Sequence, residues 1–153
     1  MEENWKGNGV APPGEQPGRN SGDHCVKIIV ENGGDIFMHL HQSATVSLFA
    51  GPSPLSHKVG LKIHPEPETW GVCTSSGTVG HSLSFGQADA ACVVAHDTAL
   101  ADACATALGN RVSGAADIQQ ALDWVAGLPG LTGALVVVGE HIGAWGRIEL
   151  VPL

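Results

Sequence analysis

Short runs of hydrophobic and β-branched residues recur along the chain, and they predict a protein built mainly from strands. In the segment 57–63 every second residue from Val59 is hydrophobic, which is typical of a strand with one buried face. The segment 88–95 is rich in small residues and suits a strand that is buried on both faces. Further strands are predicted at 26–30, 35–40, 45–50, 71–74, 135–138 and 144–151, with a turn at 139–143.

Two segments follow the helical period instead. Hydrophobic residues recur at i, i+3, i+4 and i+7 from 118 to 125, and Gly127 follows as a stop signal. The other helix is predicted at 98–108, because Asp97 suits the N-cap and Gly109 the C-terminal stop. Strands followed by two helices and a final hairpin predict an α+β fold, with a mostly antiparallel sheet packed by two helices. In the helix at 98–108 the apolar stripe is predicted at Leu100, Ala103, Cys104, Ala107 and Leu108.

Residues 1–23 differ in composition from the remainder of the chain. They are rich in Gly, Pro, Asn and Glu and have almost no hydrophobic side chains, so burial cannot offset the entropy lost on ordering them. We therefore predict a flexible leader at 1–23. With 43% hydrophobic residues among 153, the chain is long enough for one core, which predicts a single domain at 24–153.

Net charge and cysteine content indicate which classes of partner are disfavoured and which cellular compartment is expected. The formal net charge of −8 at pH 7 argues against binding to nucleic acid or to an anionic membrane, both of which favour a basic surface. A phosphate ligand remains compatible, since backbone N–H groups or a metal can hold it. The four cysteines form no C-x-x-C pair, and the sequence has neither a signal-peptide pattern nor an apolar run of membrane-spanning length. These features predict a cytoplasmic protein.

Candidate chemistry is concentrated between residues 74 and 106. Asp102 and Thr106 lie four residues apart in a predicted helix, so a carboxylate and a hydroxyl share one face and can hold Mg²⁺ against a phosphate. The hydroxyl- and glycine-rich loop 74–80 suits an anion cradle of backbone N–H groups. His81 follows the loop and can take a proton near neutral pH. The alternatives are an ordinary helix-surface pair, a hydroxyl-rich turn and a structural histidine.

The tetrapeptide Glu31-Asn32-Gly33-Gly34 separates two predicted strands and is typical of a hairpin turn. The paired glycines also let a ligand approach the backbone closely, with Asp35 at the edge of that approach. A plain tight turn is the alternative.

Several of these motifs occur in an order that resembles the ApbE flavin transferase superfamily. They are the segment 32–36, the Thr74-Ser75-Ser76-Gly77 loop, His81 and the helical segment 101–107. The sequence is most similar to an ApbE-related branch whose members read E-N-G-G-D-I-F and T-S-S-G-T-V-G. The resemblance runs from residue 26 to residue 153. Members of the superfamily carry a further N-terminal half, so the resemblance implies the C-terminal portion of such a protein.

The resemblance implies an Mg²⁺-dependent enzyme that cleaves FAD, transfers FMN to a threonine hydroxyl of a flavoprotein target and releases AMP. It places the metal ligands at Asp102 and Thr106, and a base near the transferred phosphate at His81. It implies a site for the flavin nucleotide at Asn32, Gly33, Gly34, Asp35, Thr74, Ser75, Ser76, Gly77 and Thr78.

Two departures from the superfamily pattern keep other functions open. The superfamily's H-I-I-D-P-x-T-G run reads H-S-L-S-F-G at 81–86, without the acidic residue and the proline, and the N-terminal half has no counterpart before residue 26. A non-catalytic module that binds flavin or another nucleotide is therefore one alternative. The other is a structural fragment that assembles through exposed sheet edges, for example as a homo-oligomer.

Overall fold

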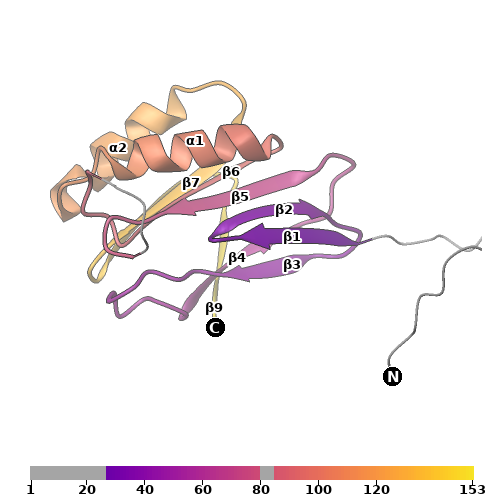
Figure 1. Cartoon of the computed structure of the whole chain (residues 1–153), viewed down its shortest axis with the longest axis horizontal. Coiled ribbons are helices and arrows are strands. Elements are labelled where there is room, and N and C mark those ends of the chain that lie inside the picture. The colour runs from indigo at the N-terminus through magenta and orange to yellow at the C-terminus, as the bar shows by residue number, and fades with distance from the viewer. Residues whose placement is uncertain (1–26, 80–84) are drawn as a thin grey trace, which may run out of the picture.

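A computed structural model of the chain describes residues 27–79 and 85–153. The described residues form three layers: two helices, a six-stranded sheet and a three-stranded sheet (Figure 1). In both sheets every neighbouring pair of strands is antiparallel. The predicted α+β class, with a mostly antiparallel sheet packed by two helices, is confirmed. The predicted leader at 1–23 and His81 lie outside the described residues.

The large sheet has the order β1-β2-β5-β6-β7-β8, and its strands are β1 (Ile28–Asn32), β2 (Asp35–His39), β5 (Trp70–Ser75), β6 (Ala90–Ala95), β7 (Leu131–Val138) and β8 (His141–Gly146). The small sheet has the order β3-β4-β9, formed by β3 (Ala44–Ser47), β4 (Val59–Ile63) and β9 (Glu149–Pro152). The helices are α1 (Thr98–Gly109) and α2 (Ile118–Ala126), and a short 3₁₀ turn, η1 (Ala115–Asp117), precedes α2. No helix among these is long and apolar enough to cross a membrane.

Two hydrophobic cores lie on opposite faces of the large sheet. One fills the space between the sheet and the helices, and the other fills the space between the two sheets. Strand β6 serves both: Val93 belongs to the helix-side core, and Val94 to the core between the sheets. All six residues of β6 are buried, which confirms the prediction of a strand covered on both faces.

Helix α1 begins where the sequence predicts. The Asp97 carboxylate accepts hydrogen bonds from the N–H groups of Ala99 and Leu100, at 2.9 and 3.2 Å, and so satisfies donors that have no partner within the helix. The predicted apolar stripe is wrong in part, because Ala103 is exposed. The buried face consists of Ala101, Cys104, Ala105, Leu108 and Gly109. Small residues occur on most sides of α1, so the sequence of the helix does not indicate which side is buried. The packing of α1 against β5 and β6 selects that side.

The predicted final strand at 144–151 is also wrong as a single element. The chain bends after Gly146, which has φ +83°, and the N–H of Ile148 bonds back to the carbonyl of Gly146 at 3.0 Å. Strand β8 therefore stays in the large sheet, whereas β9 crosses to the small sheet and pairs with β4. The turn before β8 is shorter than predicted, because Gly139 adopts φ +58° and β8 already starts at His141.

Candidate functional site

The hairpin turn between β1 and β2 is held against the end of β5. Gly33 and Gly34 have φ of +62° and +101°, the left-handed conformations that favour glycine in such a turn. The N–H of Gly34 donates to the Glu31 carboxylate at 3.0 Å, and the N–H of Thr74 donates to the carbonyl of Gly34 at 3.1 Å. The turn is thereby fixed beside the start of the hydroxyl-rich loop.

The hydroxyl-rich loop is held by bonds within the protein. Ser76 Oγ accepts from the N–H groups of Thr78 and Val79 at 3.1 and 3.0 Å, and the N–H of Gly77 donates to the Ala88 carbonyl at 2.9 Å. The predicted cradle of backbone N–H groups is therefore wrong for residues 77–79, because these donors already have acceptors. The hydroxyl residues that line the cavity beside this loop are Thr74, Ser75 and Ser76.

Thr78 points its hydroxyl away from a ligand and into the protein. Its Oγ1 donates to the Asp89 carboxylate at 2.9 Å, and the other oxygen of Asp89 accepts from the N–H of Gly139 at 2.7 Å. Among the described residues Asp89 is the only buried charged side chain, and these two bonds stabilise its carboxylate. Thr78 therefore anchors the loop to the turn that follows β7.

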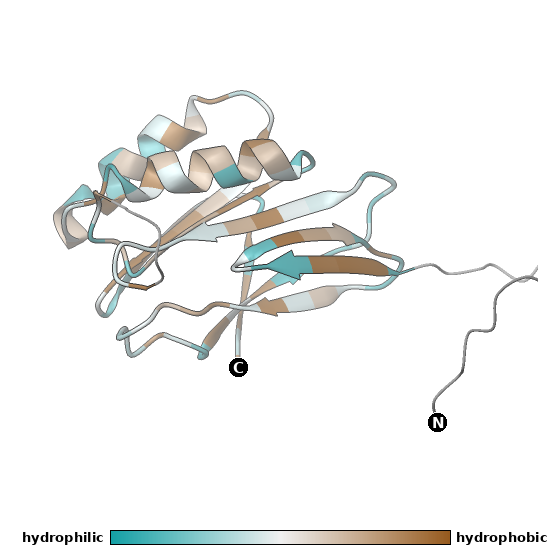
Figure 2. Cartoon of the chain, viewed as in Figure 1, coloured by the Kyte–Doolittle hydropathy of each residue, from teal (hydrophilic) through white to brown (hydrophobic). Residues whose placement is uncertain are grey.

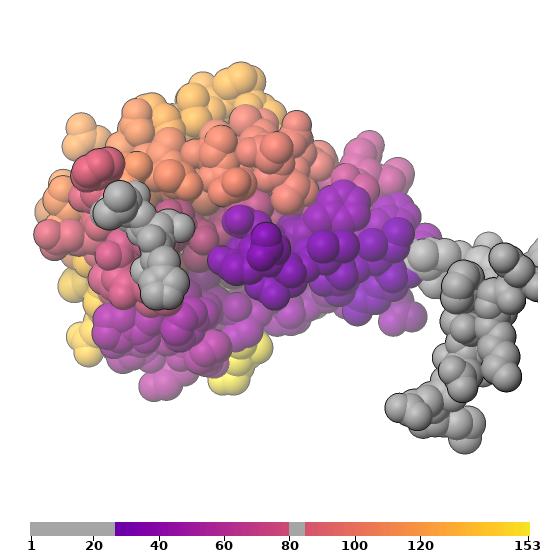
Figure 3. Space-filling view, in the orientation of Figure 1, coloured from indigo at the N-terminus to yellow at the C-terminus, as the bar shows by residue number. Residues whose placement is uncertain are grey.

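A cavity of about 620 Å³ brings the remaining predicted residues together. Its volume lies within the usual range for a small-molecule site. Helix α1 contributes Asp102 and Thr106, both exposed on the same face of the helix. In Figure 3 the indigo surface of the β1–β2 hairpin lies against the coral surface of α1, and these elements contact one another. The predicted residues that line the cavity are Gly33, Gly34, Asp35, Thr74, Ser75, Ser76, Asp102 and Thr106, whereas Asn32, Gly77 and Thr78 do not.

The cavity is acidic. Glu31, Asp35 and Asp102 line it, and within residues 27–79 and 85–153 no Lys or Arg lines it. Burial raises the pKa of Asp35, the negative charge of Asp102 raises this pKa further, and a hydrogen bond with the Cys73 thiol partly offsets the rise. The negative charge of Asp102 therefore destabilises the ionised form of Asp35, and a cation bound beside Asp35 would relieve that repulsion.

Asp102 and Thr106 present oxygen donors, the type of ligand that Mg²⁺ binds. Among residues 27–79 and 85–153, no three His, Cys, Asp or Glu side chains are grouped to hold a metal ion. Zinc sites usually require such a group. Mg²⁺ instead binds through one or two carboxylates and completes its octahedron with water and substrate phosphates. Asp102 and Thr106 fit this pattern of oxygen ligands.

One wall of the cavity was not predicted from the sequence. Val46 and Ser47 of β3, together with Phe49, line it from the small sheet. Phe49 is half exposed and its ring stacks on that of His57, with ring centroids 5.1 Å apart. The sequence around Phe49 carries no motif for a ligand, because its place beside the hairpin depends on how the two sheets pack.

A comparison of the sequence with known families finds a match that includes the residues of the large cavity. A family model described as AbpE bacteria matches residues 19–144, a stretch that contains every residue lining the cavity. The chain belongs to this family. The predicted relationship is thereby confirmed at the level of the AbpE bacteria family, while flavin transfer stays a prediction.

Relatives of the AbpE bacteria domain occur in methanogens. A UPF0280 protein of Methanosarcina acetivorans is 49% identical over 121 residues, which are 78% of this chain and 47% of that protein. A UPF0280 protein of Methanococcus aeolicus is 48% identical over 128 residues, or 81% of this chain and 52% of that protein. The chain therefore spans about half the length of the curated relatives it matches.

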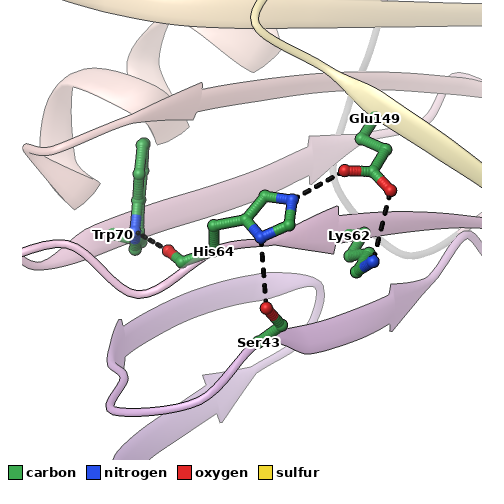
Figure 4. A network of polar contacts seen from close by, with 5 residues as sticks. All are labelled: Ser43, Lys62, His64, Trp70 and Glu149. Carbon is green, nitrogen blue, oxygen red and sulfur yellow. Dashed lines mark hydrogen bonds and ion pairs between the residues drawn. The ribbon is translucent and has the colours of Figure 1, made fainter.

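The AbpE bacteria domain has a second, smaller cavity of about 310 Å³ near the C-terminal end of β4. None of the predicted site residues that the structure describes lines it. Figure 4 shows its polar network: the His64 ring lies between Ser43 Oγ at 3.1 Å and Glu149 at 2.6 Å, and Glu149 also pairs with Lys62 at 3.4 Å. The hydrogen bond with His64 holds the pKa of Glu149 below its usual range. Trp70 Nε1 donates to the His64 carbonyl at 2.9 Å, so the network links the two sheets.

Proposed function

We propose that the large cavity binds Mg²⁺ together with the diphosphate of FAD, as the metal-binding part of an FAD-cleaving FMN transferase. The observation that supports the proposal is that residues from separate segments of the chain line one cavity. Asp102 and Thr106 line the same cavity as the Gly33-Gly34 turn and the hydroxyl residues at or directly after the end of β5, Thr74, Ser75 and Ser76. A carboxylate and a hydroxyl beside a close-approach turn are the groups that a metal-bound diphosphate requires.

The electrostatics make the metal a requirement for this ligand. The diphosphate of FAD is anionic, and the described part of the chain presents Glu31, Asp35 and Asp102 to the cavity but no Lys or Arg. The nucleotide alone would be repelled, whereas Mg²⁺ bound between the carboxylates and the diphosphate would compensate both sets of charges. We therefore expect FAD to bind only when Mg²⁺ is present.

In the proposed reaction a threonine hydroxyl of a flavoprotein target attacks the phosphorus of the FMN half of FAD. A new O–P bond forms, the P–O bond to AMP breaks, and AMP leaves with the bridging oxygen. Bound Mg²⁺ would supply charge neutralisation at the diphosphate during this exchange. Asp102 and Thr106 would hold the metal, and Gly34 would admit the phosphate, because the turn carries no side chain there. His81 stays the predicted base for the hydroxyl proton.

A module that binds the nucleotide without cleaving it is the second candidate. This alternative requires only groups that hold the metal and the phosphates, which the described lining residues can supply, and no group that moves a proton. The two candidates share the metal site and differ only in the release of AMP.

The metal site is tested by calorimetric titration of FAD into the protein, with Mg²⁺ and with EDTA. We expect binding only with Mg²⁺, and we expect Asp102→Asn to weaken it at least about tenfold, the equivalent of losing roughly 1.4 kcal/mol of charge–cation interaction. Asp123→Asn is the matched control, because Asp123 is an exposed helical aspartate on α2 outside the cavity. Chromatography of the same mixtures detects AMP and separates the enzyme from the binding module.

Two results would contradict the proposal. One is FAD binding that is equally tight in EDTA, which would exclude the metal from the site. The other is an Asp102→Asn variant that binds FAD like Asp123→Asn, which would reduce Asp102 to a surface carboxylate.

A further inference from the structure

Strand β1 is an edge strand with an unusually hydrophobic surface. Within the described residues, no strand pairs with its outer side, and all five of its residues are exposed. Ile28, Ile29 and Val30 retain 42%, 45% and 57% of their accessible surface. Figure 2 shows the body of β1 in brown at the front of the large sheet. Proteins usually protect such edges with charge, proline or a covering segment, because an exposed apolar edge pairs readily with another strand.

The hairpin determines which backbone groups of β1 face outward. Asn32 and Asp35 flank a two-residue turn and therefore form a hydrogen-bonded pair. Bonding alternates along an antiparallel ladder, so the backbone groups of Ile28 and Val30 also point to β2. Those of Ile29 and Glu31 point away from β2, toward the open edge. Lys27, which precedes the strand, continues this outward set.

We propose that two copies of this chain associate through β1, antiparallel and about a two-fold axis, with Ile29 opposite the partner's Ile29. This register places outward-facing backbone groups against outward-facing ones, as a ladder requires. On one face of the joined sheet Lys27 lies opposite the partner's Glu31, and Glu31 opposite the partner's Lys27. On the other face Ile28 lies opposite the partner's Val30.

The segment Lys27-Ile28-Ile29-Val30-Glu31 is thus complementary to itself in antiparallel pairing. Opposite charges meet twice and hydrophobic residues meet three times, which are the favourable cross-strand pairs. A shift by one residue would oppose outward groups to groups already bonded to β2. A shift by two toward the turn would place Glu31 opposite the partner's Ile29 and leave Lys27 without an acidic residue across from it.

The pairing would also change the large cavity. Glu31 lines that cavity and accepts a hydrogen bond from the N–H of Gly34 through one carboxylate oxygen. The partner's Lys27 would approach the other oxygen and so bring a basic group to the rim of a cavity that no described Lys or Arg of the same chain lines. The second copy would therefore contribute a residue to the site.

A pair of five-residue strands buries much less than the roughly 1,200–2,000 Å² of a stable interface. We therefore expect a weak dimer, with a dissociation constant on the order of 10⁻⁵ to 10⁻³ M, whose population rises with protein concentration. Screening of the two charge pairs should make the dimer weaker at high salt.

Sedimentation velocity of the full chain, from about 1 µM to about 1 mM, tests the proposal. We expect the wild-type chain to dimerise, Lys27→Glu to weaken the dimer at least about tenfold, and the double variant Lys27→Glu/Glu31→Lys to restore it, because the swap exchanges the signs across the axis. Ile29→Lys should abolish the dimer by placing two ammonium groups at the axis. Ile142→Lys is the control, since Ile142 is 38% exposed on β8, at the opposite edge of the same sheet.

Thermal melts of each variant establish that it is folded. A wild-type chain that stays monomeric at the highest concentration would overturn the proposal, as would a dimer that Ile142→Lys abolishes and Ile29→Lys does not. A folded charge swap that stays as weak as Lys27→Glu would overturn the proposed register. None of these outcomes depends on FAD or Mg²⁺, so they are independent of the proposed function.

Discussion

Gly77 lies in the hydroxyl-rich loop, and adding a methyl group there tests how closely this loop packs against the neighbouring backbone. Its N–H donates to the carbonyl of the buried Ala88, and the loop at this point lies directly beside the backbone of Gly86. A Cβ added to Gly77 would overlap the Gly86 carbonyl oxygen and would lie 2.8 Å from the carbonyl carbon and 3.3 Å from the N of Gln87. The preferred separation of carbon atoms is about 3.5–4.0 Å, so one backbone segment would have to move by about 1 Å.

The expected cost of Gly77→Ala follows from this overlap. Overpacking of this kind costs about 1–3 kcal/mol, and the loss of unfolded-state freedom on replacing glycine returns about 0.4–1 kcal/mol. Because the overlap is with backbone atoms, the cost lies in the upper part of its range, and the net loss of unfolding free energy is about 1–2 kcal/mol. For a domain of this length each kcal/mol corresponds to about 2–4 °C, so the melting temperature should fall by roughly 2–8 °C.

The assay is thermal unfolding followed by circular dichroism, with Gly114→Ala as the matched control. Gly114 has an extended backbone, and a Cβ built there has no neighbour within 4 Å, so the same substitution should stabilise the protein slightly. A Gly77→Ala variant that melts at or above the Gly114→Ala variant would refute the close approach of the two backbone segments.

Two further predictions concern titratable groups around the cavity. Because burial and the Asp102 charge raise the pKa of Asp35, the stability that Asp35 contributes is complete at acid pH and is lost as the pH rises through its raised folded-state pKa. Asp35→Asn should therefore stabilise the metal-free protein in urea titrations at pH 8 and have little effect at pH 3.5, whereas an equal effect at both would contradict this reasoning. Burial raises the pKa of Cys73 to about 12 and that of Cys92 to about 11, so at pH 8 fewer than roughly one thiol in a hundred is ionised. Iodoacetamide should label both only after unfolding, and peptide mass spectrometry showing equally fast labelling of the native protein would contradict their burial.

Elements whose ends are defined by neighbouring residues could be predicted from the sequence. Asp97 caps α1 because its carboxylate reaches N–H groups two and three residues ahead. Gly33 and Gly34 form the hairpin turn because they adopt left-handed dihedral angles at low cost. The order of the elements then indicated the α+β class. The one-turn spacing of Asp102 and Thr106 likewise places both side chains on one helix face without any knowledge of the fold.

The features that could not be predicted from the sequence depend on contacts between distant segments of the chain. The buried face of α1 could not be predicted, because Ala, Cys and Leu occur around most of the helix and only the fit against β5 and β6 selects a side. The amides of the loop were expected to bind a ligand, but Ala88 and the Ser76 hydroxyl already accept from them. Phe49 reaches the cavity only because the small sheet packs beneath the large one. The sequence by itself determined the local elements and the chemical groups available, since these depend on adjacent residues. Only the tertiary structure decided which groups meet in the cavity and which edge stays open, since both depend on packing between distant segments.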